Sequence, residues 1–512
     1  MGGWSLFPSV SLPPAFHPLD FIMKIRSISL AAALACVASS SFALTPAQID
    51  ASTVQLWING ATAPTASVYG GIRKLCVDAN SNGAPDDLHV YLEKSVTTAA
   101  DAAPGKSAAG KFAAYACTMG PAAGADLEGK KTVVYHTFDV GSFEAYTPHL
   151  FLAGEVNPSV SGSVKRLKNI AATTGNTCAL TAFATQDPTY LACGSLAVTV
   201  APNASVNAVP TLPVGGVSDT EYTLNQLNLG VIKSLADIGS EVSTNVAQGF
   251  GLAVSYPLYV AMQQSQGITS PACAATGSGA AITAVNTTPA CQPNVSRQKY
   301  SSLVGGGAAD KDAGLLASTL AGSPLQVERR VGTSGTQSSS NAFFLNAPCA
   351  TGLATGALTP DGSNSVGSTV YDFVTIRSNN GSGDVKANIT AASNANAYAI
   401  GVLSLENAAA GTEKFAFTKL NSVSPTADAK QRQTAIDGDY EFWYELVAFT
   451  AATAPAEGAG LLTGLATVLG DPSVTDLRGL FATPLSGFAN VDFPTQVSKG
   501  FKAGNACSVS TQ

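Results

Sequence analysis

Charged side chains are scarce in this chain: Asp, Glu, Lys and Arg together make up 12% of its 512 residues. The 27 basic and 34 acidic residues leave a formal net charge of −7 at pH 7. This acidic balance gives no electrostatic case for binding nucleic acid or an anionic membrane. Disorder through charge excess is also disfavoured, because hydrophobic residues make up 46% of the chain.

The usual ligands of transition metals are rare as well. The sequence has four histidines and no Cys-x-x-Cys pair, so a zinc site is disfavoured. Residues 78–86 resemble the front half of a calcium loop, but the twelfth position is His89 instead of a bidentate Glu, which favours a polar turn. His136 and His149 are too few for a metal cluster. No G-x-S-x-G or H-E-x-x-H motif occurs, and we expect no catalysis, metal or cofactor.

Beyond its first 43 residues, the chain has no run of about 18 apolar residues, the length that a membrane-spanning helix needs. Met23 opens a short basic stretch, residues 28–37 are apolar, and Ser41-Phe-Ala43 matches a cleavage site. We interpret residues 23–43 as a signal peptide cut after Ala43, and residues 1–22 as an over-extended gene start. We therefore expect a periplasmic or extracellular protein that does not span the membrane.

Nine cysteines occur, and Cys36 would leave with the signal peptide. The remaining even number in an exported chain predicts disulfides. Proximity along the sequence suggests three pairs, and elimination gives the fourth, although connectivity is not fixed by sequence. The suggested pairs are Cys76 with Cys117, Cys178 with Cys193, Cys273 with Cys291, and Cys349 with Cys507.

Apolar strand-like stretches alternate with helix-like ones, which predicts an α/β protein. We expect strands at residues 54–58, 131–136, 250–256, 325–329 and 399–404, and helices at 67–75, from near 337, 439–449, 459–469 and 473–481. Ligands of α/β sheets bind beyond the carboxyl ends of strands. Thr62, Ser142, Asp219 and residues 330–336 each follow an expected strand, and we group them for that reason.

Residues 330–336, Arg-Val-Gly-Thr-Ser-Gly-Thr, form a compact anion cradle. Arg330 supplies a permanently charged fork of donors, and Ser334 and Thr336 add hydroxyls. Gly335 allows close backbone approach, and a helix starting near Gln337 would direct free N–H groups to the same place. Taken alone, the segment is explained equally well as a polar turn with one surface arginine.

Taken in order, these motifs resemble those of the phosphate-binding proteins of bacterial phosphate importers and the related DING proteins, which are type 2 periplasmic binding proteins. The resemblance spans most of residues 54–449, and Ala63 stands where the family usually has Phe. The matching segments are Gly-Ala-Thr62-Ala63-Pro, Val140-Gly-Ser142, Gly-Val-Ser218-Asp219, Arg330-x-x-x-Ser334-Gly335-Thr336, Ala-Ile400-Gly and Ser424-Pro-Thr.

The resemblance implies an α/β, two-lobed type 2 periplasmic-binding-protein fold with disulfide-clipped insertions. Lobe 1 would comprise residues 44–255 and 432–512, and lobe 2 residues 256–431. Phosphate, or a related oxyanion, would bind between the lobes for delivery to the membrane subunits of an ABC importer. The implied binding residues are Thr62, Ala63, Ser142, Ser218, Asp219, Arg330, Ser334, Gly335 and Thr336.

Asp219 would accept the proton that a hydrogen phosphate carries, whereas sulfate has no such proton and would face an unpaired carboxylate. A helix cap in a Ser-Asp turn is the structural alternative for Asp219. Two other functions stay open: an extracellular structural or adhesive protein that keeps the binding-protein fold, and phosphate capture for signalling.

Overall fold

The computed structural model describes residues 44–139, 141–171, 178–181, 183, 187–206, 208–307, 311–350, 355–360 and 365–511. By its contacts the chain divides into residues 1–42 and 43–512, and every described residue belongs to the second unit. The expected leader and signal peptide, residues 1–43, lie outside the described residues, and so does Val140 of the Gly-Ser motif.

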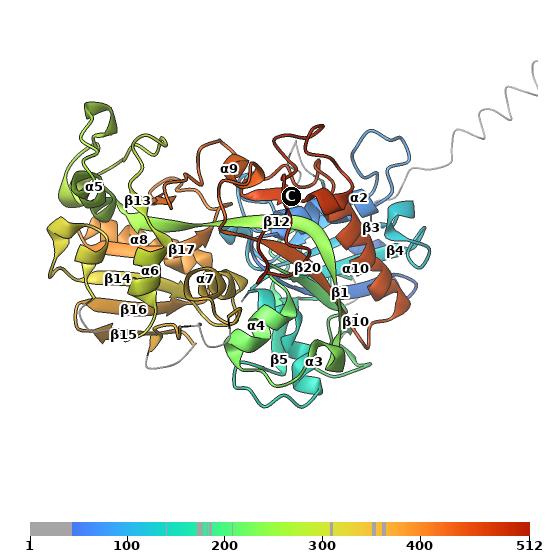
Figure 1. The fold of residues 1–512 in the computed structure, drawn as a ribbon. Coiled ribbons are helices and arrows are strands. Elements are labelled where there is room, and N and C mark those ends of the chain that lie inside the picture. Colours follow the sequence, from blue (N-terminus) through green and yellow to red (C-terminus); the bar gives the residue numbers. More distant parts are fainter. Residues whose placement is uncertain are drawn as a thin grey trace, which may run out of the picture. The chain divides into compact units, whose positions relative to one another are not determined.

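The described chain contains both strands and helices, with α-helices between many of the strands and strands β5 to β11 in direct succession (Figure 1). The helices are α2 Thr65–Leu75, α3 Thr147–Leu152, α4 Tyr222–Leu229, α5 Tyr256–Ser265, α6 Arg297–Val304, α7 Gly335–Leu345, α8 Ser382–Asn394, α9 Gln433–Ile436 and α10 Ala456–Leu469. The strands are β1 Val54–Gly60, β2 His89–Leu92, β3 Phe112–Thr118, β4 Lys131–Thr137, β5 Ser163–Leu167, β6 Ala179–Thr181, β7 Thr189–Leu191, β8 Ser195–Thr199, β9 Ser205–Val206, β10 Val209–Pro210, β11 Gly215–Ser218, β12 Gly239–Ser255, β13 Asn294–Val295, β14 Leu325–Arg330, β15 Gly367–Tyr371, β16 Val374–Asn379, β17 Tyr398–Ser404, β18 Phe415–Phe417, β19 Lys419–Leu420, β20 Trp443–Ala451 and β21 Leu480–Ala482.

Most strands join one mixed sheet of 15 strands, which confirms the expected α/β class. Its order is β15-β16-β14-β17-β12-β20-β11-β1-β4-β3-β2-β7-β6, and β18 and β21 pair with β12. Within it, β1 pairs in parallel with β4 and β11, and β14 pairs in parallel with β16 and β17. Each parallel group therefore presents its carboxyl ends at one edge.

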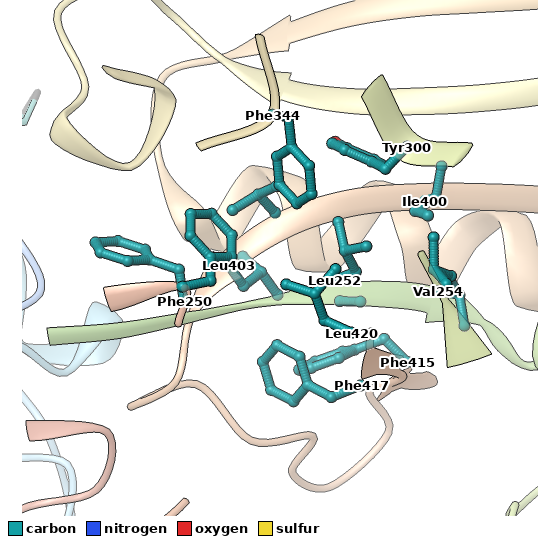
Figure 2. Close-up of a cluster of buried hydrophobic side chains, with 14 of the residues drawn as sticks. Phe250, Leu252, Val254, Tyr300, Phe344, Ile400, Leu403, Phe415, Phe417 and Leu420 are labelled. Carbon is teal, nitrogen blue, oxygen red and sulfur yellow. The ribbon is translucent and has the colours of Figure 1, made fainter. Parts of the chain in front are cut away.

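Strand β12 has different partners along its length. Residues 239–243 and 247–249 pair with β20 on either side of an irregularity in the register, and residues 250–254 pair with β17. Phe250, Leu252 and Val254 alternate along the strand and are fully buried, which is the pattern of one face of a sheet. Figure 2 shows these three side chains in a cluster with residues from β17, β18, α6 and α7. The hydrophobic core around the second half of β12 thus binds together elements that are far apart in sequence.

The expected strands at 54–58, 131–136, 250–256, 325–329 and 399–404 are confirmed, and so are the helices at 67–75, from near 337, and at 459–469. The helix expected at 439–449 is wrong: Trp443 and Tyr444 open strand β20. That strand is buried on both faces, so it has no polar alternation to separate it from a helix. The helix expected at 473–481 is also wrong, because residues 473–479 form turns before β21.

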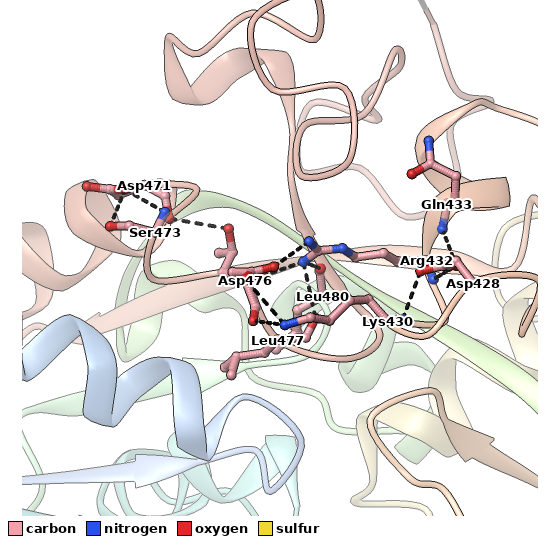
Figure 3. Close-up of polar contacts among 10 residues, drawn as sticks. Asp428, Lys430, Arg432, Gln433, Asp471, Ser473, Asp476, Leu477 and Leu480 are labelled. Carbon is pink, nitrogen blue, oxygen red and sulfur yellow. Dashed lines mark hydrogen bonds and ion pairs between the residues drawn. The ribbon is translucent and has the colours of Figure 1, made fainter. Parts of the chain in front are cut away.

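Those turns are fixed by Arg432, whose side chain is 2% exposed. Its Nη1 donates to the carbonyl oxygens of Thr475 and Leu480 at 2.8 and 2.9 Å, and to that of Leu477 at 3.2 Å. Its Nη2 donates to Asp476 at 2.7 Å (Figure 3). One buried guanidinium therefore supplies the hydrogen bonds that a regular helix would have supplied.

All four expected disulfides are present. They pair Cys76 with Cys117, Cys178 with Cys193, Cys273 with Cys291, and Cys349 with Cys507. In the described residues, no helix has the length and apolar character needed to cross a bilayer.

Replacing the buried arginine should be far more costly than replacing its exposed neighbour. Arg432→Ala leaves several buried carbonyl groups without donors, so we expect the free energy of unfolding to fall by about 3 kcal/mol. Lys430→Ala is the matched control, because Lys430 and its partner Asp476 are 46% and 47% exposed. An exposed pair of this kind contributes less than about 1 kcal/mol. Urea unfolding of both variants checks this, and equal losses would contradict the anchoring role of Arg432.

Candidate functional site

Two motifs that are 77 residues apart in sequence meet in a buried hydrogen bond. Ser142, which follows β4, donates through Oγ to Asp219 Oδ2 at 2.9 Å. The backbone N–H of Asp219, which follows β11, donates to Ser142 Oγ at 3.3 Å. Ser142 is fully buried and Asp219 is 4% exposed. Because β4 and β11 both run parallel to β1, their carboxyl ends bring these residues to one edge of the sheet.

A third motif approaches this pair through Gly335, the first residue of α7. A Cβ atom at Gly335 would lie 2.3 Å from Ser142 Oγ and 2.8 Å from Asp219 Cβ, so only glycine permits this contact. The neighbouring backbone is joined as well, because Phe143 N–H donates to the carbonyl of Thr333 at 3.1 Å. The loop after β4, the loop after β11 and the start of α7 therefore form one cluster.

Arg330 ends β14 and is 4% exposed. Its Nε and Nη2 donate to the carbonyl of Asn380 at 3.1 and 2.6 Å, and its Nη1 donates to Ser382 Oγ at 3.0 Å. These bonds engage three of the five N–H groups of a guanidinium. Burial lowers the pKa of Arg330 to about 10, and the nearby carboxylates of Asp219, Asp384 and Glu406 oppose that shift. Arg330 is thus a buried cation at neutral pH, held in place by the loop after β16.

Asp219 is the most unusual carboxylate of the cluster. Burial raises its pKa to about 6, while the hydrogen bond from Ser142 and the charge of Arg330 act in the opposite direction. Among the described residues, its Oδ1 atom is buried and has no hydrogen-bond partner. A buried acceptor of this kind is costly unless a bound group donates to it. The site therefore offers one strong acceptor beside several donors.

Sequence reasoning missed a second carboxylate, Glu406, which follows β17. Its Oε1 accepts from Ser404 Oγ at 2.7 Å and from Asn407 Nδ2 at 2.9 Å, and its Oε2 is buried without a partner in the described chain. Burial raises its pKa to about 7, and Asp219 adds to the shift. Because β17 lies parallel to β14, the end of the expected strand at 399–404 was the signal for this residue.

Helix α4, which follows the loop containing Asp219, also contacts helix α7 through polar side chains. Ser338 Oγ on α7 donates to Asn225 Oδ1 on α4 at 2.9 Å, and Asn341 Nδ2 lies 3.3 Å from Asn228 Oδ1. The first turn of α7 contains Gly335 and Thr336, whose N–H groups belong to the unpaired set at a helix start. The arrangement suits an anion that touches α7 and the loop containing Asp219 together.

The other expected site residues have different surroundings. Thr62 Oγ1 donates to the carbonyl of Phe138 at 3.0 Å, and Ala63 lies beside it in the turn before α2. Ser218 Oγ donates to the carbonyl of Thr220 at 2.6 Å, within its own turn. Ser334 is the N-cap of α7 and is 1% exposed. Ser142, Asp219, Arg330, Ser334, Gly335 and Thr336 thus lie at the cluster, while Thr62, Ala63 and Ser218 stay predicted contacts.

The histidines and the calcium-like loop have the following surroundings. The described residues contain no group of three His, Cys, Asp or Glu side chains arranged to hold a metal. Burial lowers the pKa of His136 to about 3 and that of His149 to about 4, so both are neutral. In the calcium-like loop, both oxygens of Asp78 accept backbone N–H groups, from Asn82 at 3.1 Å and Gly83 at 2.8 Å. This is the hydrogen bonding of a polar turn.

Comparisons with known proteins complete the description. No protein-family model matches the chain, and no curated protein matches it. A solved structure from Clostridium perfringens, assigned as a phosphate ABC transporter substrate-binding protein with bound phosphate, is similar over 84% of this chain and 99% of its own, with 10% identity and a TM-score of 0.35. A second, assigned as a possible phosphate-binding protein from Planctomyces limnophilus, covers 51% of this chain and 71% of its own, with 9% identity and a TM-score of 0.27.

Adding one methyl group at the centre of the cluster should disrupt it. Gly335→Ala places a Cβ within 3 Å of Ser142 and Asp219, so we expect the free energy of unfolding to fall by about 2 kcal/mol. Gly383→Ala is the control, since a Cβ at that position in α8 would meet nothing within 4 Å. Helix propensity should then stabilise the protein by about 0.5–1 kcal/mol. A gain in urea stability for both variants would contradict the close contact.

The raised pKa of Asp219 makes the stability of the ligand-free protein depend on pH. Its folded pKa of about 6 exceeds the unfolded value of 3.8, so the folded chain binds a proton more tightly, and stability falls as pH rises through this window. Asp219→Asn keeps the neutral form. We expect the free energy of unfolding of Asp219→Asn, minus that of the natural chain, to increase by about 2 kcal/mol as the pH is raised from 4.5 to 7.

Urea unfolding at the two pH values measures this difference. Asp439→Asn is the control, because it makes the same substitution at an exposed residue outside the cluster. A parallel pH dependence for Asp219→Asn and the natural chain would show that Asp219 is not protonated preferentially in the folded state.

Proposed function

We propose that the chain is an exported solute-binding protein that captures inorganic phosphate, or a related protonated oxyanion, without chemically altering it. The observation that carries this proposal is the buried cluster in which Asp219 has an unpartnered Oδ1 beside Ser142, Gly335 and the charge of Arg330. In this proposal the proton of the ligand pairs with Asp219 Oδ1 while the oxygens of the ligand accept from donors nearby, so the ligand is an anion that still carries a proton.

In this proposal, the oxygens of phosphate lie at the start of α7. Arg330 supplies charge-assisted hydrogen bonds, and the hydroxyls of Ser142, Ser334 and Thr336 donate alongside the N–H groups of Gly335 and Thr336. Thr62, Ala63 and Ser218 complete the shell from the loops after β1 and β11. Asp219 Oδ1 accepts the phosphate proton. Sulfate has no proton to offer at neutral pH, so it leaves the carboxylate unpaired.

The site must open to admit a ligand, because Ser142, Asp219 and Arg330 are at most 4% exposed. We propose that residues 44–255 with 432–512 form one lobe and residues 256–431 the other, and that the lobes part about a hinge to admit the ligand. Ser142 and Asp219 belong to the first lobe, and Arg330 and Gly335 to the second.

The four disulfides support an exported protein, since such bonds persist in oxidising compartments. Export places the protein where it delivers phosphate to the membrane subunits of an ABC importer, which is the role we propose. No part of the proposed role needs a nucleophile or a cofactor.

Titration with phosphate and sulfate tests the proposal. Phosphate at 100 times its Kd should stabilise the folded chain by about 2.7 kcal/mol, which is visible as a higher Tm. Arg330→Ala should abolish that rise, because it removes the only positively charged side chain among the proposed ligands. No rise in Tm at millimolar phosphate for the natural chain would refute phosphate binding.

Asp219→Asn separates the role of the carboxylate from anion binding in general. An amide group does not repel sulfate, so the ratio of phosphate affinity to sulfate affinity should fall at least about tenfold, as the penalty for a buried unpaired charge implies. Isothermal titration at neutral pH measures both affinities, with Asp439→Asn as the exposed control. An unchanged ratio would remove Asp219 from selectivity.

A further inference from the structure

The Cys349–Cys507 disulfide joins the two parts of the chain that the proposed site needs to separate. Gly335 packs against Ser142 and Asp219, and all three are buried. A ligand therefore enters only when α7 moves away from the loops that contain Ser142 and Asp219. Any covalent link between these two sides limits that movement.

Cys349 belongs to the α7 side. Helix α7 starts at Gly335 and ends at Leu345, and Asn346 caps it in the left-handed conformation. Cys349 follows three residues later, and Ala350 N–H donates back to the carbonyl of Asn346 at 2.9 Å. Phe344 on α7 packs against Tyr300 on α6, with ring centroids 4.4 Å apart. One helix thus connects the proposed binding residue Gly335 to Cys349.

Cys507 belongs to the Asp219 side. Ala506 N–H donates to the carboxylate of Glu221 at 2.9 Å, and Glu221 lies two residues beyond Asp219. Lys502 and Gly504 donate their N–H groups to the carboxylate of Glu445 on β20, which pairs with β11 directly before Asp219. The C-terminal segment, residues 499–511, is therefore fastened to the strands that position Asp219.

A buried cation strengthens this attachment. Lys502 is 8% exposed, and its Nζ donates to the carbonyl of Trp443 at 2.8 Å. The same Nζ lies 4.6 and 4.3 Å from the ring centroids of Trp443 and Tyr444. Cation–π contacts of this kind are strongest when desolvated. The C-terminal segment is hence a firm anchor for Cys507.

The disulfide is also accessible. Cys507 is exposed and Cys349 half-buried, whereas Cys76, Cys117, Cys273 and Cys291 are all buried. A dithiol can reach this disulfide. One thiolate of the dithiol attacks a sulfur of the disulfide to form a mixed disulfide, and its second thiol then closes the ring and releases the remaining cysteine thiol. The protein gains two electrons and two protons as two cysteine thiols, and the reductant leaves as a cyclic disulfide.

We propose that the Cys349–Cys507 disulfide is a reducible strap that limits how far α7 separates from the loop containing Asp219. The strap holds the ligand-free chain near its closed arrangement, so it slows both entry and release of the ligand. The identity of the ligand rests on the proposed function, whereas the restraint on opening does not.

Small-angle X-ray scattering without phosphate tests the restraint directly. Cys349→Ser with Cys507→Ser should give a larger radius of gyration than the natural chain. The matched control is Cys273→Ser with Cys291→Ser, which opens a disulfide 18 residues apart in one insertion and should leave the radius unchanged. Equal radii for the natural chain and the strap variant would overturn the proposal. Should the double variant fail to fold, natural protein treated with dithiothreitol provides the same comparison.

Stopped-flow binding of phosphate provides the second measurement. Cutting the strap should raise both the association and the dissociation rate constants at least about threefold, because opening limits ligand exchange. A larger radius with no phosphate binding in any form would refute the proposed function and support the strap. Phosphate binding with unchanged rate constants and an unchanged radius would refute the strap and leave the proposed function standing.

Discussion

The hydrogen bonding of strand β12 is the constraint on which the rest of the structure depends. Residues 239–243 and 247–249 pair with β20, and residues 250–254 pair with β17. Through these neighbours the sheet runs continuously from β11, which precedes Asp219, to β14, which ends at Arg330. The register of β12 therefore sets how the two groups of parallel strands direct their carboxyl ends. A shift of one residue would turn Phe250, Leu252 and Val254 away from their core, so the register is strongly specified.

The order of the strands also sets the electrostatics of the site, because it decides which charged side chains lie close together. The sheet places Arg330 and Asp219 at neighbouring buried positions, where removing each group from water is costly. Their mutual attraction offsets part of that cost, yet burial still raises the pKa of Asp219 to about 6 and that of Glu406 to about 7. In the described residues, Asp219 Oδ1 and Glu406 Oε2 are buried and have no hydrogen-bond partner. A ligand that donates a proton to Asp219 relieves part of this imbalance, which is the physical basis of the proposed selectivity.

Much of this site could be predicted because its chemistry is local. Residue type and spacing in residues 330–336 predict an anion site, and the apolar pattern predicts the strands that end before Ser142 and Arg330. Strand β11, which precedes Asp219, was not among the expected strands. Glu406, Asn380 and Ser382 could not be recognised in the same way, because their roles depend on which strands lie beside β14. Strand β20 was taken for a helix because burial on both faces removes the period-two signal. Long-range pairing, rather than local preference, decided each of these cases.

The contact between α4 and α7 shows how such a site can be both buried and able to open. Two apolar surfaces pressed together would resist separation, because exposing them to water is unfavourable. The hydrogen-bonded side chains Asn225, Asn228, Ser338 and Asn341 exchange their mutual bonds for bonds to water at little net cost. Phe343 and Phe344 of α7 also pack against Phe442, which precedes β20, so opening exposes some apolar surface as well. Neither contact sets a limit on how far α7 separates. A covalent link at the far end of α7 provides that limit, which is why the polar contact and the Cys349–Cys507 disulfide complement each other.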